Sequence, residues 1–157
     1  MIGRRPLLAQ TLFAFLLCPG TVAFVIPLFV IAPAGRRKFA DVSGLIPLAV
    51  GTALLLWCVR EFYVAGRGTL APWAPPQKLV GTGPYRFSRN PMYVAVLLVL
   101  AGWAIGFRSW PLGIYALVLA VAFQVRVVLY EEPWLAQTHG QKWTVYKSTV
   151  PRWFWSG

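Results

Sequence analysis

The chain has 157 residues, of which 58% are hydrophobic and only 12% are charged, and its formal net charge is +11. The length excludes two large domains, and the composition excludes an ordinary soluble domain. The basic residues lie in loops between apolar segments rather than on one soluble face, so we expect no nucleic-acid partner. Such a surplus is common on the cytoplasmic loops of membrane proteins. We therefore expect one membrane-embedded domain over residues 1–157.

Apolar segments of about 20 residues predict membrane-spanning helices. We predict four such spans, at residues 7–34, 44–65, 92–108 and 111–131. The first contains Pro19-Gly20 and Pro27 and is too short for two crossings, so we expect one tilted or kinked helix. It lacks a small-residue cleavage site, which favours a retained span over a signal peptide. The predicted fold class is all-α: a polytopic membrane protein with about four transmembrane helices and a C-terminal interfacial helix.

The distribution of basic residues predicts the orientation, because cytoplasmic loops are enriched in Lys and Arg. Four spans place both termini on one side, together with the loop after the second span. Nine basic residues lie on that side and four on the other (Arg4, Arg5, Arg67, Lys78, Arg86, Arg89, Lys142, Lys147 and Arg152 against Arg36, Arg37, Lys38 and Arg108). We therefore expect cytoplasmic termini, cytoplasmic segments at 66–91 and 132–157, and a prokaryotic inner membrane as the location.

Two polar features stand out, the loop and helix start at Gly81–Tyr93 and the adjacent pair Glu131-Glu132. The chain has only four acidic residues, and carboxylates at the end of an apolar span are costly without a partner. Both features adjoin predicted spans, which indicates a site for a polar ligand at the membrane surface. The alternatives are a basic anchor with an aromatic belt for the loop, and surface ion pairs for the glutamates. Gly81-Thr82-Gly83 lacks the remaining features of a dinucleotide fingerprint.

The two glutamates are expected to have different partners. In an α-helix Gln124 and Glu131 share a face, whereas Glu132 points about 100° away. One carboxylate could meet a ligand ammonium group, and the other an arginine or backbone donors. Arg60-Glu61 is interpreted as a local surface ion pair, and His139 as a surface or capping residue. The single histidine and scattered carboxylates predict no metal site.

The motifs together resemble the isoprenylcysteine carboxyl methyltransferases and the related membrane phospholipid methyltransferases. The fragments that carry the resemblance run in order from about Trp57 to the C-terminus. They are Gly66-Arg67-Gly68-Thr69, Ala71-Pro72, Leu79-Val80, Gly83-Pro84-Tyr85-Arg86, Arg89-Asn90-Pro91-Met92-Tyr93, Glu131-Glu132, His139-Gly140, Tyr146 and Val150-Pro151-Arg152. The resemblance implies a helical membrane enzyme that uses S-adenosyl-L-methionine without a Rossmann domain.

The resemblance also implies where the cofactor and substrate bind. The implied cofactor-binding residues are Gln77, Lys78, Leu79, Val80, Tyr85, Asn90, Pro91, Met92, Tyr93, Glu131 and Glu132. In this scheme Glu131 holds the amino or ribose end of the cofactor. Glu131, Glu132 and Tyr93 are the candidates for proton transfer from an acceptor, and Arg126 and Arg89 are the candidates for substrate binding.

Two positions depart from the family pattern. The family often has histidine where this chain has Asn90, and asparagine does not titrate near neutral pH, so we expect no proton transfer there. The prenylcysteine enzymes tie an arginine to substrate one helical turn before the binding glutamate. That position is Val127, and α-helical spacing places Arg126 about 100° around the helix from it. This argues against prenylcysteine as the substrate.

The expected function is methyl transfer from S-adenosylmethionine to a lipid-like or membrane-partitioned acceptor, whether a carboxylate, an amine or a thiol. The expected partners are the lipid bilayer and this lipophilic acceptor. One alternative is a membrane reductase of similar helical architecture, in which Arg86 and Arg89 would bind the 2′-phosphate of NADPH. The other is a membrane scaffold without catalytic activity.

Overall fold

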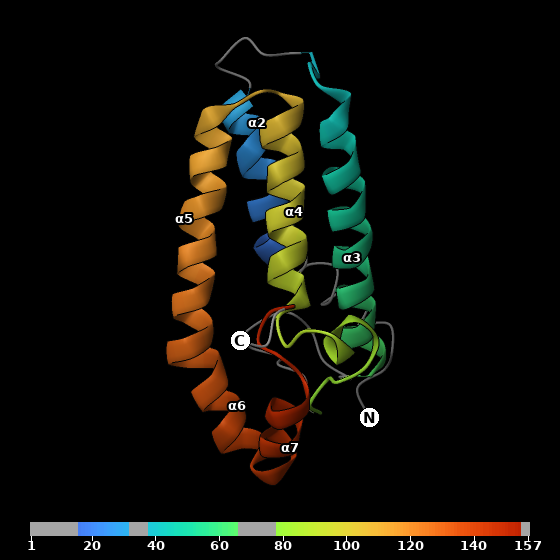
Figure 1. The fold of residues 1–157 in the computed structure, drawn as a ribbon, viewed down its shortest axis with the longest axis vertical. Coiled ribbons are helices and arrows are strands. Elements are labelled where there is room, and N and C mark those ends of the chain that lie inside the picture. The colour runs from blue at the N-terminus through green and yellow to red at the C-terminus, as the bar shows by residue number, and fades with distance from the viewer. Residues whose placement is uncertain (1–15, 32–37, 66–77, 155–157) are drawn as a thin grey trace.

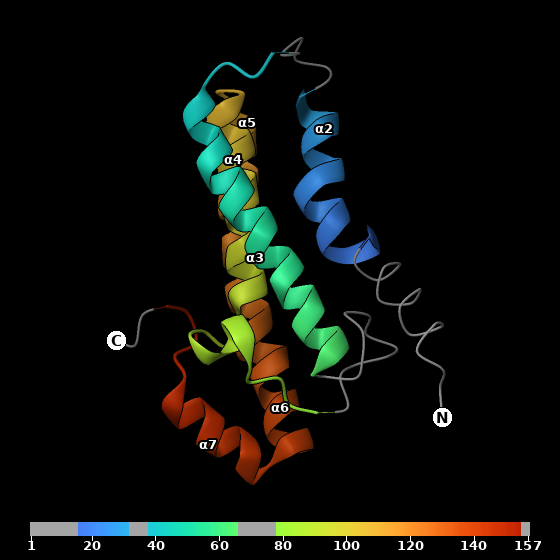
Figure 2. The ribbon, with the colours of Figure 1, turned by 90° about the vertical axis from the view of Figure 1, so that its right-hand side faces the viewer.

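The computed structural model describes residues 16–31, 38–65 and 78–154, and within these ranges it contains helices and no strand. Its elements are η1 (Leu16–Val25), α2 (Ile26–Ile31), η2 (Val42–Gly44), α3 (Leu45–Val64), η3 (Gly83–Arg86), α4 (Pro91–Gly106), α5 (Trp110–Arg126), η4 (Val127–Glu131), α6 (Glu132–His139) and α7 (Gln141–Thr149). Here η1 and η4 are π-helices, and η2 and η3 are 3₁₀ turns. Helices α2, α3, α4 and α5 lie side by side, and α6 and α7 lie at one end of the bundle (Figures 1 and 2). The all-α prediction is confirmed.

Two helices are long and apolar enough to cross a membrane. They are the 23 residues Val42–Val64 and the 30 residues Trp110–His139. The apolar helices Pro19–Ile31 and Pro91–Gly106 are shorter. The 16 residues of α4 extend about 24 Å, against about 30 Å for a hydrocarbon core. The second and fourth predicted spans therefore correspond to helices of spanning length, whereas the four-span topology stays a prediction.

The helix that contains the fourth predicted span continues beyond residue 131. Residues 127–131 form a π-helix and lead directly into α6, so that the helix runs on to His139. Pro133 lies in the first turn of α6, directly after the π-helical residues 127–131, and the helix runs through it. The predicted interfacial segment consists of two short helices, α6 and α7, joined at Gly140 with a φ of +50°.

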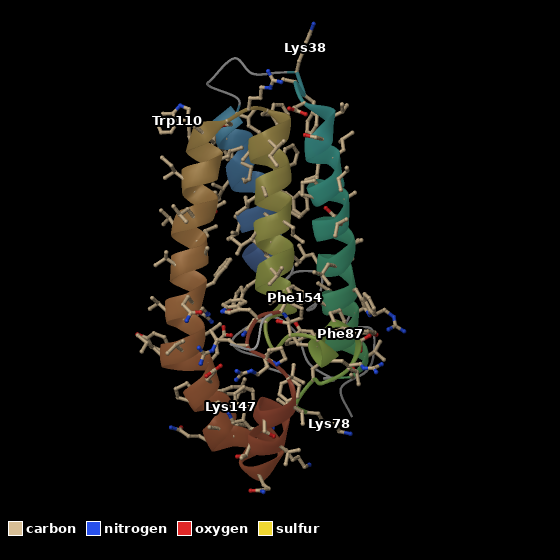
Figure 3. The ribbon with its side chains drawn as sticks, viewed as in Figure 1. Lys38, Lys78, Phe87, Trp110, Lys147 and Phe154 are labelled. Atoms are coloured by element: carbon tan, nitrogen blue, oxygen red, sulfur yellow. The ribbon has the colours of Figure 1, made fainter. Side chains whose placement is uncertain are left out.

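Large apolar side chains cover the outer faces of the two long helices. On α5, Leu117, Val118 and Val121 are 59 to 66% exposed, and Trp110 at its start is 71% exposed (Figure 3). On α3, Ile46 and Leu56 are likewise exposed. An exposed apolar surface of this extent needs a cover, and lipid chains provide one around a membrane helix.

Helices α3 and α4 approach so closely that glycines are needed between them. A Cβ atom on Gly51 would lie 2.7 Å from the backbone nitrogen of Val99, and one on Gly102 would lie 2.6 Å from that of Leu48. Close backbone contact through small residues is typical of membrane helices, which gain no hydrophobic driving force from lipid. This packing fixes the position of α4 against α3.

The first helix is tied to the bundle through carbonyl groups near Pro27. Proline has no N–H, so the carbonyl of Ala23, four residues earlier, loses its partner within the helix. Trp103 Nε1 donates to that oxygen at 3.0 Å, and Tyr115 Oη donates to the carbonyl of Val22 at 3.4 Å. Residues 16–31 thus form one continuous helix with a π-helical start, while 7–15 and 32–34 of the predicted span lie outside the described residues.

Candidate functional site

The polar residues singled out in the sequence gather at one end of the bundle. This end contains the end of α3, the turn η3, the start of α4, the π-helix η4 and residues 150–154. Lys78, Phe87, Lys147 and Phe154 lie here, whereas Lys38 and Trp110 lie at the opposite end (Figure 3). The gathering follows from the chain path, because α4 begins where α5 ends.

The loop before α4 is anchored on α3 by Glu61. This carboxylate is buried, and it accepts hydrogen bonds from Thr82 Oγ1 at 2.6 Å and from Arg60 at 2.9 Å. Gly83, with a φ of +57°, lies directly against it, since a Cβ atom there would be 2.8 Å from the Glu61 carboxyl carbon. The predicted pair with Arg60 is present, but the prediction that it is a surface feature is wrong for Glu61. The sequence feature that could have indicated this anchor is the position of Glu61, an acidic residue at the end of an apolar span.

Tyr85 lies in a buried cluster below this anchor. Its ring meets Phe62 edge-to-face at 5.4 Å, and it packs with Cys58 and Val80. Its carbonyl accepts a hydrogen bond from Tyr146 Oη at 2.7 Å, and burial raises the pKa of the Tyr85 phenol well above its ordinary value. Of the neighbouring residues implied for the cofactor, Lys78 is exposed and Leu79 is half-buried, while Gln77 lies outside the described residues.

Tyr93, Arg126 and Glu131 form one hydrogen-bonded cluster. Tyr93 Oη donates to Glu131 Oε1, and Arg126 Nε donates to the same oxygen at 2.8 Å and to Tyr93 Oη at 3.2 Å. The Tyr93 ring stacks on Phe123 of α5 at 4.3 Å. No described residue donates to Glu131 Oε2, and the Glu131 side chain is 30% exposed. The cluster therefore presents one carboxylate oxygen that can bind a ligand.

The π-helix explains why Arg126 reaches Glu131. Regular α-helical spacing would turn these residues away from each other, and the prediction that Arg126 lies to one side of the glutamate was made on that basis. Residues 127–131 are π-helical, so the chain is wider here and residues five apart come together. The α-helical spacing assumed in that prediction is therefore wrong for residues 127–131, and the argument that it gave against prenylcysteine as the substrate no longer follows. π-Helical turns often occur at functional sites.

Glu132 is held by two arginines. Arg152 donates through Nε to Oε1 at 2.8 Å and through Nη2 to Oε2 at 2.9 Å, while Arg89 Nη1 donates to Oε1 at 2.8 Å. The side chains of Glu132 and Arg89 are only 11% and 9% exposed. Glu132 therefore has the arginine partners expected for one of the two glutamates, and both its oxygens are occupied. This geometry favours a positioning role over cofactor contact.

Residues 150–153 join the loop before α4 to the glutamates. The Arg152 carbonyl accepts hydrogen bonds from Ser88 Oγ at 3.2 Å and from Asn90 Nδ2 at 2.9 Å, and the Pro151 carbonyl accepts one from the Arg89 N–H at 2.9 Å. The Asn90 side chain thus has a structural role, because its amide holds the chain at Arg152. Arg152 was part of the recognised motifs but absent from the predicted site, because nothing in the sequence pairs it with Glu132.

Of the remaining candidates, Met92 packs both on the apolar core and on the buried cluster of Tyr85. Pro91 is buried in the first turn of α4, and His139 meets Trp134 edge-to-face at 6.2 Å. Within the described ranges no group of three or more His, Cys, Asp or Glu side chains could hold a metal ion.

These features define the class of protein as an all-helical, membrane-type fold with a polar site at one end of its apolar helices. The comparison with protein families gives the family directly. The model of the phospholipid methyltransferase family matches residues 39–142, more than half of the chain, and the protein belongs to that family. The matched region contains Glu61, Tyr93, Arg126 and both adjacent glutamates, but not Arg152. No curated protein and no solved structure matches the chain.

Proposed function

We propose that the protein transfers a methyl group from S-adenosylmethionine to a phospholipid-type acceptor at the cytoplasmic face of a membrane. Membership of a methyltransferase family supports the reaction class. The observation that carries the proposal is the Tyr93–Arg126–Glu131 cluster, which joins helices of the matched region and leaves one Glu131 oxygen without a donor among the described residues. The two helices of spanning length support the membrane location.

The residues present fit this cofactor by the chemistry of their donors and acceptors. Glu131 Oε2 can accept a hydrogen bond from an ammonium group or a ribose hydroxyl. Gly81 lies beside the ring of Tyr146, which a Cβ atom on it would contact at 3.4 Å. We assign cofactor binding to Glu131, Tyr93 and the 78–82 loop. We assign Glu132 and Asn90 to holding these cofactor-binding segments in place.

The bound cofactor supplies an electrophilic methyl group, and the protein positions the acceptor against it. Alignment and exclusion of water can contribute about 7–11 kcal/mol. Tyr93 and Arg126 fix Glu131 in one orientation. An amine acceptor must lose a proton, which Glu132 cannot take while both its oxygens are held by arginines.

Arg126 is the better placed of the two arginines for a lipid acceptor. Its side chain is 60% exposed at the end of the apolar helix α5, at the level where a lipid headgroup would lie. We propose that it meets the acceptor headgroup. The NADPH alternative is less favoured, because the family whose model matches the chain is a methyltransferase family.

Replacing Glu131 by Gln tests the cofactor assignment. Glu131→Gln keeps the size of the side chain but removes its charge, so we expect the affinity for S-adenosylhomocysteine to fall about tenfold or more. The measurement is calorimetric titration of the detergent-solubilised protein. Arg86→Gln, an exposed change at the same end of the bundle, should leave the affinity unchanged. Equal affinity in the Glu131→Gln variant and the wild type would contradict the assignment.

A further inference from the structure

One edge of the Arg89 guanidinium has no partner among the described residues. Arg89 gives one hydrogen bond, from Nη1 to Glu132, although its side chain is only 9% exposed. Its Nε atom is buried and has no acceptor. Neither Nε nor Nη2 donates to any residue that the structure describes. A buried charged donor without an acceptor is unfavourable, so this edge calls for an explanation.

The surroundings of Arg89 do not balance its charge. Glu132 is its one carboxylate partner, and both oxygens of Glu132 already accept hydrogen bonds from Arg152. The ring of Trp143, itself buried, covers the Arg89 guanidinium at 5.6 Å from the ring centre. Two buried or half-buried arginines therefore share one carboxylate, which leaves a positive charge inside the fold. Burial lowers the pKa of Arg89, and the neighbouring Arg152 acts in the same direction against Glu132.

The free edge has the right form for an anion with two oxygens. Arg152 uses the equivalent pair, Nε and Nη2, to bind both oxygens of Glu132. This fork matches carboxylate and phosphate groups. Arg89 lies two residues before the start of α4, the helix that carries Tyr93, and its partner Glu132 directly follows Glu131. A ligand whose cationic end meets Glu131 would therefore have its anionic end near Arg89.

We propose that the Nε–Nη2 edge of Arg89 is a binding subsite for a carboxylate or phosphate group of the ligand. This inference rests on the proposed function, which offers two sources of such an anion. One is the amino-acid carboxylate of the cofactor, and the other is the phosphodiester of the lipid acceptor. In either case the subsite and Glu131 together select a ligand that carries both charges.

The test uses Arg89→Lys, which keeps a cation beside Glu132 but removes the two-pronged edge. In the first arm, calorimetry compares S-adenosylhomocysteine with its decarboxylated analogue, which retains the amine. If the cofactor is the source, the wild type binds S-adenosylhomocysteine roughly 10- to 100-fold more tightly than the analogue. The variant should lose that preference and bind the analogue as well as the wild type does.

The second arm measures the melting temperature in detergent with phosphatidylethanolamine or with diacylglycerol, which lacks the phosphate. If the lipid is the source, phosphatidylethanolamine stabilises the wild type more than diacylglycerol does, and Arg89→Lys removes the difference. An unchanged ligand preference in both arms, or an equal loss for every ligand, would overturn the subsite. If the wild type binds neither nucleoside, the proposed function fails, and the second arm still decides on the subsite.

Discussion

Replacing Glu132 by Gln is expected to destabilise the protein by about 3–5 kcal/mol, the usual cost of removing one member of a buried ion pair. The variant loses the charge that holds Arg89 and Arg152, whose guanidinium groups would remain with no carboxylate partner. The loss should also loosen residues 88–90, which are held to Arg152 through its carbonyl. Denaturation of the detergent-solubilised protein, followed by loss of helix signal, measures the change.

Glu131→Gln is the matched control for that experiment, because the two residues are adjacent and chemically identical. The Glu131 side chain is 30% exposed and its partner Arg126 is 60% exposed, so solvent screens this pair. We expect a change in stability below about 1 kcal/mol. Equal destabilisation by the two substitutions would contradict the division of roles, in which Glu132 maintains the structure and Glu131 meets the ligand.

Replacing Gly102 by Val should prevent α3 and α4 from packing. The added Cβ atom would lie 2.6 Å from the nitrogen of Leu48 and 2.8 Å from the carbonyl oxygen of Gly44, and backbone atoms cannot rotate away. We expect a cost of about 3 kcal/mol, at the upper end of the usual range for overpacking. The start of α4 should shift with it, so binding of S-adenosylhomocysteine should weaken too.

Gly113→Val provides the comparison, since a Cβ atom at Gly113 meets nothing within 4 Å. Both positions lie in apolar helices, so the two variants differ chiefly in the space around the new side chain. Melting temperatures in detergent should show a large fall for Gly102→Val and almost none for Gly113→Val. Similar values for the two variants would mean that α3 and α4 are not in close backbone contact.

Much of the fold could be predicted from the sequence because apolar length is a strong signal. The second predicted span, 44–65, agrees closely with the helix Val42–Val64. The continuation of the helix beyond the fourth predicted span was not foreseen, because Glu131-Glu132 and Pro133 look like a boundary. In the structure the π-helix carries the chain through them, and its wider turn depends on tertiary contacts that periodicity does not report.

The site was predicted in part. The sequence brought Tyr93, Arg126 and Glu131 into one candidate set, and the structure joins them by hydrogen bonds. The sequence could not distinguish the roles of Glu131 and Glu132. The difference between them is that Glu132 binds Arg152, which lies twenty residues further along the chain. Nor could the sequence show that Glu61 is buried, since its partner Thr82 comes from a separate loop.

The most direct test of the proposed reaction is methyl transfer by the protein reconstituted into phosphatidylethanolamine vesicles with methyl-labelled S-adenosylmethionine. We expect label in the extracted lipid with the wild type and at least about tenfold less with Glu131→Gln. The headgroup that carries the label then identifies the acceptor chemistry. A folded wild-type protein that neither labels any lipid nor binds S-adenosylhomocysteine would contradict the proposal.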